Sequence, residues 1–231
     1  MKSLLKTSLM TALLAGVVGL AGTAAYADAL LPNTTIVGPS TTLFFGGVLL
    51  ATATSTFNNG ALAGTARVAV FSGGAGTCAG CLDFYYQFTN TGAAGVNDSV
   101  SRTTNFNFLS AAVTTNVFQI TNGSLIGAAG FQNGTIASFS ADRSPDGSTI
   151  GQTFTMGLFG PGTTNLAFVI RTNATLFTTG NYAIIDGVSF NNSGFGPIAP
   201  TGVPEPASML LLGTGLAGLA GAFRNSGRKA R

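Results

Sequence analysis

The stretch from Leu82 to Asn90, LDFYYQFTN, alternates between apolar and polar side chains. Its apolar members, every second residue from Leu82 to Phe88, fall on one face of a strand, because successive strand side chains point to opposite sides. An alternation with a period of two indicates a β-strand with one buried face. We therefore predict a strand here, with Asp83, Tyr85 and Gln87 on its exposed face.

Similar short runs rich in Thr, Val, Phe and Ile recur on both sides of this strand, separated by clusters of Gly, Asn and Ser. Helix signals are absent, since no long stretch places apolar residues three to four positions apart. The predicted strands are 42–57, 66–71, 82–90, 101–109, 113–120, 135–140, 152–158, 166–171 and 182–190. This pattern predicts an all-β fold, an antiparallel β-sandwich of jelly-roll-like type. A β-solenoid is the alternative, although no fixed repeat period is seen.

The N-terminal segment, residues 1–27, has the three parts of a secretory signal peptide. Lys2 and Lys6 supply the positive charge, residues 9–20 are apolar, and Ala25-Tyr26-Ala27 is a small-x-small cleavage site. We predict cleavage before Asp28, with an uncleaved membrane anchor as the alternative. The secretion translocon and signal peptidase are then implied partners, and the mature chain begins outside the cytoplasm.

The net charge of +3 comes from the two ends of the chain. Between residues 28 and 200, four Arg stand against six Asp, so the middle is slightly acidic and carries no nucleic-acid footprint. Charged residues make up only 7% of the chain. We expect a neutral surface of Thr, Asn, Ser and Gly, which offers little charge repulsion against self-association or contact with neutral polymers.

Common catalytic side chains are missing. The chain has no His, its Lys residues stand only at positions 2, 6 and 229, and its one Glu is Glu205. Ser-His-Asp and Cys-His arrangements and His-ligated metals are thereby excluded. We expect no catalytic residue, no metal and no cofactor, and hence no enzyme. Paired carboxylates are the enzymatic alternative, because two suffice for glycoside cleavage; the candidates are Asp83, Asp98, Asp142, Asp146 and Asp186.

Cys78 and Cys81 are the only cysteines. In an exported chain they predict a disulfide that pins the turn before the Leu82 strand, rather than a redox motif or a metal site. Tyr85 and Tyr86 could offer a stacking surface for sugars, although core and rim positions are the preferred interpretation. Six Asn-x-Ser/Thr sequons also occur, at Asn33, Asn97, Asn122, Asn133, Asn173 and Asn191.

The end of the chain is organised differently. Residues 28–193 form the predicted domain, and the Pro-containing segment 194–202 is the predicted linker. Val203, Pro204, Glu205 and Pro206 precede an apolar segment, 207–223, whose 17 uncharged residues are enough to predict a transmembrane helix. The chain closes with a basic stop-transfer tail, residues 224–231, that favours the cytoplasmic side; its basic residues are Arg224, Arg228, Lys229 and Arg231.

Residues 203–231 resemble the PEP-CTERM sorting domain of Gram-negative bacteria, with its Pro-Glu-Pro motif, apolar span and basic tail in order. The resemblance implies recognition by an exosortase, a transient stay in the inner membrane, and release to the cell surface or extracellular matrix. It also implies an association with exopolysaccharide and biofilm. We therefore expect a structural or adhesive surface protein. The alternatives are a carbohydrate-binding module for the exopolysaccharide or an Asp-based polysaccharide-active enzyme.

Overall fold

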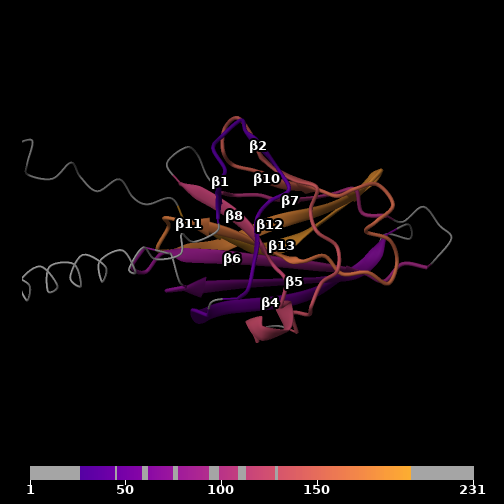
Figure 1. Cartoon of the computed structure of the whole chain (residues 1–231), viewed down its shortest axis with the longest axis horizontal. Coiled ribbons are helices and arrows are strands. Elements are labelled where there is room, and N and C mark those ends of the chain that lie inside the picture. Colours follow the sequence, from indigo (N-terminus) through magenta and orange to yellow (C-terminus); the bar gives the residue numbers. More distant parts are fainter. Residues whose placement is uncertain are drawn as a thin grey trace, which may run out of the picture. The chain divides into compact units, whose positions relative to one another are not determined.

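The computed structural model describes residues 27–198 except 45, 59–61, 75–77, 94–98, 109–112 and 128–129. Strands make up nearly all the regular structure of these residues, and no α-helix occurs among them (Figure 1). The strands are β1 (Asp28–Ala29), β2 (Thr35–Val37), β3 (Thr41–Thr42), β4 (Val48–Asn58), β5 (Ala63–Ser72), β6 (Leu82–Asn90), β7 (Arg102–Asn105), β8 (Thr115–Ile120), β9 (Ser140–Arg143), β10 (Ile150–Thr153), β11 (Ala167–Thr172), β12 (Phe177–Asp186) and β13 (Val188–Pro197). One 3-10 helix, η1 (Gly123–Ile126), lies between β8 and β9. The all-β prediction is confirmed.

The strands form two sheets. The first sheet has the order β1-β8-β11-β6-β5-β4, with β3 also paired to β8. The second sheet has the order β13-β12-β7-β10-β9-β2. All strand pairs are antiparallel except that of β3 with β8. Antiparallel sheets are thus confirmed, whereas the finer jelly-roll-like assignment stays a prediction.

One hydrophobic core is shared by both sheets. β6 contributes alternate residues from Leu82 to Phe88, and β12 of the other sheet contributes Tyr182 and Ile184. Hydroxyl groups also link the sheets, because the Tyr86 hydroxyl donates to the carbonyl of Phe195 in β13. The apolar face that the alternation of β6 predicts is therefore the face turned toward the second sheet.

The opposite face of β6 is buried as well, which corrects our prediction. Asp83, Tyr85 and Gln87 are 2%, 3% and 0% exposed, respectively. A second hydrophobic cluster covers this face, to which η1 contributes Ile126 and the following segment contributes Phe131. Gln87 holds that segment in place: its Nε2 donates to the carbonyl of Gln132 at 2.7 Å, and its Oε1 accepts from the Gln132 amide at 2.8 Å.

The predicted strands 42–57, 101–109 and 152–158 are observed only in part, as β3 with β4, as β7 and as β10, and two others differ more. Residues 182–190, expected as one strand, contain the turn of a hairpin, because the chain reverses at Gly187 with a φ of 64°. Residues 194–197, expected in the linker, continue β13 and pair with β12. In the predicted strand 135–140, only Ile136 forms an isolated bridge, to Asn165, and β9 begins at Ser140.

The targeting segments cannot be compared with the structure. Residues 1–26 and 199–231 lie outside the described residues, so the predicted signal peptide core, sorting motif and transmembrane segment do too. Within the described part of the chain, no helix has the length and apolar character needed to span a membrane.

Candidate functional site

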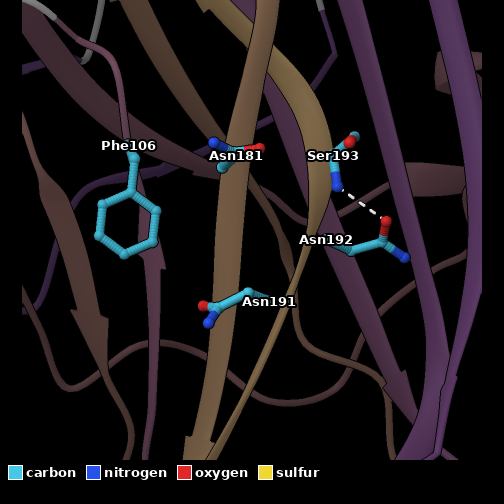
Figure 2. A pocket seen from close by; sticks show the side chains of 5 residues that line it. All are labelled: Phe106, Asn181, Asn191, Asn192 and Ser193. Atoms are coloured by element: carbon cyan, nitrogen blue, oxygen red, sulfur yellow. Dashed lines mark hydrogen bonds between the residues drawn. The ribbon is translucent and has the colours of Figure 1, made fainter.

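A shallow hollow lies on the β12–β13 hairpin, with a volume of about 540 Å³. Figure 2 shows the side chains that line it, which come from the two hairpin strands and from the residue after β7. They are Phe106, Asn181, Asn191, Asn192 and Ser193. None of these side chains carries a charge or titrates near neutral pH.

The antiparallel register of the hairpin brings these residues together. Asn181 pairs with Ser193, and Asn191 lies two residues before Ser193 on the same side of β13. Phe106 reaches the hollow because β7 pairs with β12, and its amide donates to the carbonyl of Asn181 at 2.8 Å. The Asn192 side chain is used locally, since its Oδ1 accepts from the Ser193 amide at 2.7 Å.

The hollow combines carboxamides and a hydroxyl with one aromatic ring. Carboxamides both donate and accept hydrogen bonds, which suits a neutral ligand rich in hydroxyl groups. An aromatic ring offers an apolar face that can pack against the C–H face of such a ligand. The exposed side chains of Asn181, Asn191 and Ser193 are available for these contacts. The side chains of the hollow therefore suit contact with a neutral ligand and are not suited to proton transfer.

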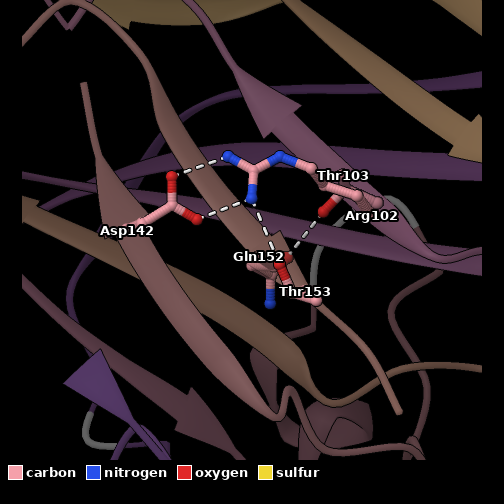
Figure 3. A network of polar contacts seen from close by, with 5 residues as sticks. All are labelled: Arg102, Thr103, Asp142, Gln152 and Thr153. Carbon is pink, nitrogen blue, oxygen red and sulfur yellow. Dashed lines mark hydrogen bonds and ion pairs between the residues drawn. The ribbon is translucent and has the colours of Figure 1, made fainter. Parts of the chain in front are cut away.

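A second polar arrangement crosses three strands of the second sheet. Arg102 of β7 makes a two-pronged ion pair with Asp142 of β9, with both N–O distances at 2.6 Å (Figure 3). The intervening strand β10 places Gly151 opposite Asp142 and Thr153 opposite Arg102. The Arg102 guanidinium also donates to the Thr153 hydroxyl at 3.1 Å.

Asp83, the first of the candidate catalytic carboxylates, is bound by Arg171 of β11. The Nη2–Oδ2 distance is 3.0 Å, and Nε of Arg171 donates to Oδ1 at 3.1 Å. Burial raises the pKa of Asp83, and the hydrogen bond and charge of Arg171 oppose this shift. Arg171 also lies over the ring of Phe118, 5.0 Å from its centroid. These contacts favour a structural role for Asp83.

The other described candidate carboxylates belong to different elements. Asp142 is in the second sheet, whereas Asp83 is in the first. Asp146 caps its own turn, accepting from Ser144 Oγ at 2.5 Å and from Ser148 Oγ at 2.7 Å, and these bonds lower its pKa to about 2. Asp186 ends β12, and Asp98 lies outside the described residues. Among the described residues, no three His, Cys, Asp or Glu side chains gather into a metal-binding group.

The predicted disulfide is confirmed. Cys78 and Cys81 are joined, with their Cα atoms 5.1 Å apart. The Cys81 amide donates to the Cys78 carbonyl at 3.0 Å, and Gly80 supplies the positive φ of 74° that this turn requires. The bond therefore closes the turn that leads into β6, as the spacing predicts.

Sequence reasoning did not find the hollow on the hairpin. The Asp186-Gly187 dipeptide is a strong hairpin signal between apolar runs, and reading it as a turn places Asn181 opposite Ser193. The contribution of Phe106 had no local signal, because it depends on β7 pairing with a strand nearly 80 residues away. Tyr85 and Tyr86, the sugar-stacking alternative, are both buried and unavailable to a ligand.

Comparisons with known proteins bear on the end of the chain. The family model for the PEP-CTERM protein-sorting motif matches residues 202–226, which include the predicted Val203, Pro204, Glu205 and Pro206. No curated protein and no solved structure matches the chain. The matched residues lie outside the described part of the structure. The chain therefore carries a PEP-CTERM protein-sorting motif, which indicates an exported, membrane-transiting protein processed by an exosortase.

Proposed function

We propose that this protein is a non-enzymatic structural or adhesive component of the cell surface or extracellular matrix. The observation that carries the proposal is the sorting motif at residues 202–226, which follows directly after the all-β domain. In this proposal the translocon and signal peptidase export the chain, and residues 207–223 hold it briefly in the inner membrane. Exosortase then releases a β-sandwich domain into an exopolysaccharide matrix, where biofilm cells are embedded.

The chemistry of the domain supports a role without catalysis. The described carboxylates Asp83 and Asp142 are each bound by an arginine, and Asp146 is bound by serine hydroxyls of its own turn. The chain contains no His. A charge-poor domain of this kind has little electrostatic repulsion from a neutral polymer or from its neighbours in a matrix.

The sorting step is tested with Glu205→Ala in the full chain, expressed in its host. We expect the wild-type protein to lose its tail and leave the membrane fraction, and the variant to keep its tail and stay there. An exosortase-deficient strain should behave like the variant. Thr201→Ala, just outside the matched residues, is the control and should be processed normally. Equal mass and equal fractionation of all four samples would overturn the sorting proposal.

A second candidate function, binding of the host's own exopolysaccharide, is favoured by the hollow on the β12–β13 hairpin. Its carboxamides and aromatic ring fit a neutral carbohydrate better than a charged ligand. Asn181 and Asn191 supply exposed amide groups on one face, and Phe106 supplies the ring.

The binding function is tested by polysaccharide pull-down of the exported protein. We expect Asn181→Ala and Phe106→Ala each to reduce the bound fraction several-fold, because each removes a hydrogen-bonding or packing contact. Thr155→Ala, an exposed loop residue, is the matched control and should bind like the wild type. Unchanged binding by both hollow variants would exclude the hollow as the site. A normal sorting result together with no binding would leave the structural role alone in place.

A further inference from the structure

Each of the two sheets has one long edge strand and one short edge strand. The first sheet ends at β4, which is 11 residues long, and at β1, which is 2 residues long. The second sheet ends at β13, with 10 residues, and at β2, with 3 residues. Short edge strands are one way in which proteins prevent unwanted strand pairing. In the described part of the chain, that protection is found only on the side of β1 and β2.

The two long edge strands lie on the same side of the domain. The rings of Phe57 in β4 and Phe190 in β13 are 5.5 Å apart. The hydroxyl groups of Ser55 in β4 and Tyr182 in β12 are 2.5 Å apart. The open edge of the first sheet therefore borders the open edge of the second, and together they form one extended side.

Neither long edge strand carries a charged residue. β4 reads VLLATATSTFN, and β13 reads VSFNNSGFGP. Charged side chains, especially Lys, are a common means of keeping edge strands from pairing. The strand register shifts between Leu49 and Ala51, and Pro197 stands only at the last position of β13. The segment 51–57 of β4, ATATSTF, is thus a regular, neutral edge.

β4 also exposes apolar side chains at its start. Val48, Leu49 and Leu50 are 64%, 43% and 45% exposed. Contiguous exposed apolar side chains commonly mark an interaction site. This apolar cluster adjoins the neutral edge segment, so one partner could cover both.

We propose that a second copy of this chain pairs with β4, antiparallel to it, and extends the first sheet across two molecules. An antiparallel pair of identical strands is related by a two-fold axis, so each copy offers the same surface and the contact closes as a dimer. A register with Thr52 opposite Thr56 of the second copy sets hydroxyl side chains against each other. It also sets Ala53 opposite Ser55 and Ala51 opposite Phe57 of the second copy, so each pair on the other face includes a small side chain.

A second copy fits this edge better than an acidic or basic partner. The edge offers no charge to a charged strand, whereas a neutral strand meets it without repulsion or desolvated ions. The Thr residues of this segment have the β-propensity that an added strand needs. The inference deepens the proposed structural role, on which it rests, by naming the partner as the same chain.

The dimer is tested by sedimentation velocity of the exported protein, purified from the host without polysaccharide. We expect a concentration-dependent dimer, and for Ala53→Lys at least a tenfold increase in the dissociation constant, because the two Lys side chains lie diagonally across the pair, on the same face and within reach of each other. Leu50→Lys is a second variant, used if the first does not fold. Val37→Lys, which places the same charge on an exposed residue of the short edge strand β2, should dimerise normally.

The outcomes are distinguishable. A monomer at all concentrations overturns the proposal, as does a dimer that neither Lys variant on β4 weakens. Loss of dimerisation by Val37→Lys as well would indicate a general effect of charge, which also overturns pairing through β4. Circular dichroism confirms that each variant is folded. Because neither exosortase nor polysaccharide takes part, failure here leaves the results of the sorting and binding experiments standing.

Discussion

Two Arg–Asp pairs of this domain differ in burial, and burial decides what each contributes to stability. The side chains of Arg171 and Asp83 are 8% and 2% exposed, whereas those of Arg102 and Asp142 are 31% and 28% exposed. Removing one partner of a buried pair leaves a charge without compensation or solvent, which costs far more than losing a solvated pair.

We expect Arg171→Met to lower the free energy of unfolding by about 3–5 kcal/mol. The loss arises because Asp83 keeps its buried position without the guanidinium that opposes the rise in its pKa. Arg102→Met, the matched control, should cost about 1 kcal/mol or less. Urea denaturation measures both. The double variant Asp83→Asn with Arg171→Met should recover part of the loss, and equal losses for the two single Arg variants would contradict the argument.

Asp146 makes a contribution to the stability of the domain that is lost in acid. Its pKa is lowered to about 2 by the hydroxyl groups of Ser144 and Ser148 and by the Ser148 amide. A carboxylate with a lowered pKa stabilises the folded state above its unfolded pKa of about 4, and that stabilisation is lost as the pH falls toward 2. Wild type and Asp146→Asn should therefore differ in melting temperature at pH 5 and converge near pH 2.

Ser148→Ala provides the control for this pH dependence. It removes one donor to the carboxylate, so the pKa of Asp146 should rise and the acid-sensitive window should move to higher pH. Melting curves at several pH values between 2 and 5 measure both variants. A constant difference between wild type and Asp146→Asn over this range would contradict the assignment.

At the scale of elements, Gly151 of β10 lets Arg102 and Asp142 join across the strand between them. A Cβ atom at Gly151 would overlap the guanidinium of Arg102. At Gly134, by contrast, a Cβ would meet the backbone of Asn165, which cannot swing aside as a side chain can. Gly151 therefore leaves room for an ion pair, whereas Gly134 leaves room for the close approach of two backbone segments.

We expect Gly151→Ala to cost about 1 kcal/mol, mainly through loss of the ion pair with Asp142. In an Arg102→Ala background the same substitution should cost much less, because the overlapping side chain is gone. Gly134→Ala should cost more than Gly151→Ala in either background. Urea denaturation of the two-by-two set measures the coupling. Full additivity of Gly151→Ala and Arg102→Ala would exclude the proposed overlap.

The local sequence pattern predicted some strands accurately and others incorrectly, for physical reasons. The bounds of β6 follow from its alternation alone, because a period of two needs no distant partner. The burial of its second face could not be predicted, since it depends on a covering segment around Phe131 that contacts it only in the folded chain. The β12–β13 hairpin was missed at Gly187, where the flanking apolar residues outweighed a turn signal that was present.

At the scale of the whole molecule, the shared core joins the two sheets into one unit. Phe84 of the first sheet and Ile184 of the second are both fully buried in it. Arg143 adds a polar link between distant segments, donating to the Thr115 hydroxyl at 3.0 Å and to the carbonyl of Val113 at 2.9 Å. The sheets should therefore unfold together and not one after the other.

We expect Phe84→Ala and Ile184→Ala each to lower the free energy of unfolding by about 2–5 kcal/mol in a single transition. Near- and far-ultraviolet circular dichroism should give coincident curves, since loss of either sheet exposes the core of both. Leu125→Ala, at a residue that is 64% exposed, is the control and should change stability by no more than about 0.5 kcal/mol. Two separate transitions in either core variant would contradict a shared core.

The sequence by itself determined the strand-forming class, the absence of histidine chemistry, the local disulfide and the sorting motif. Each of these depends on residue identity or on neighbours a few positions apart. Only the tertiary structure decided that Asp83 pairs with Arg171, 88 residues away, and that Arg102 pairs with Asp142, 40 residues away. The same holds for the hollow beside Phe106 and for the neutral edge at β4. Long-range strand pairing decides these features, because many registers satisfy the same local pattern and only the packed core selects one.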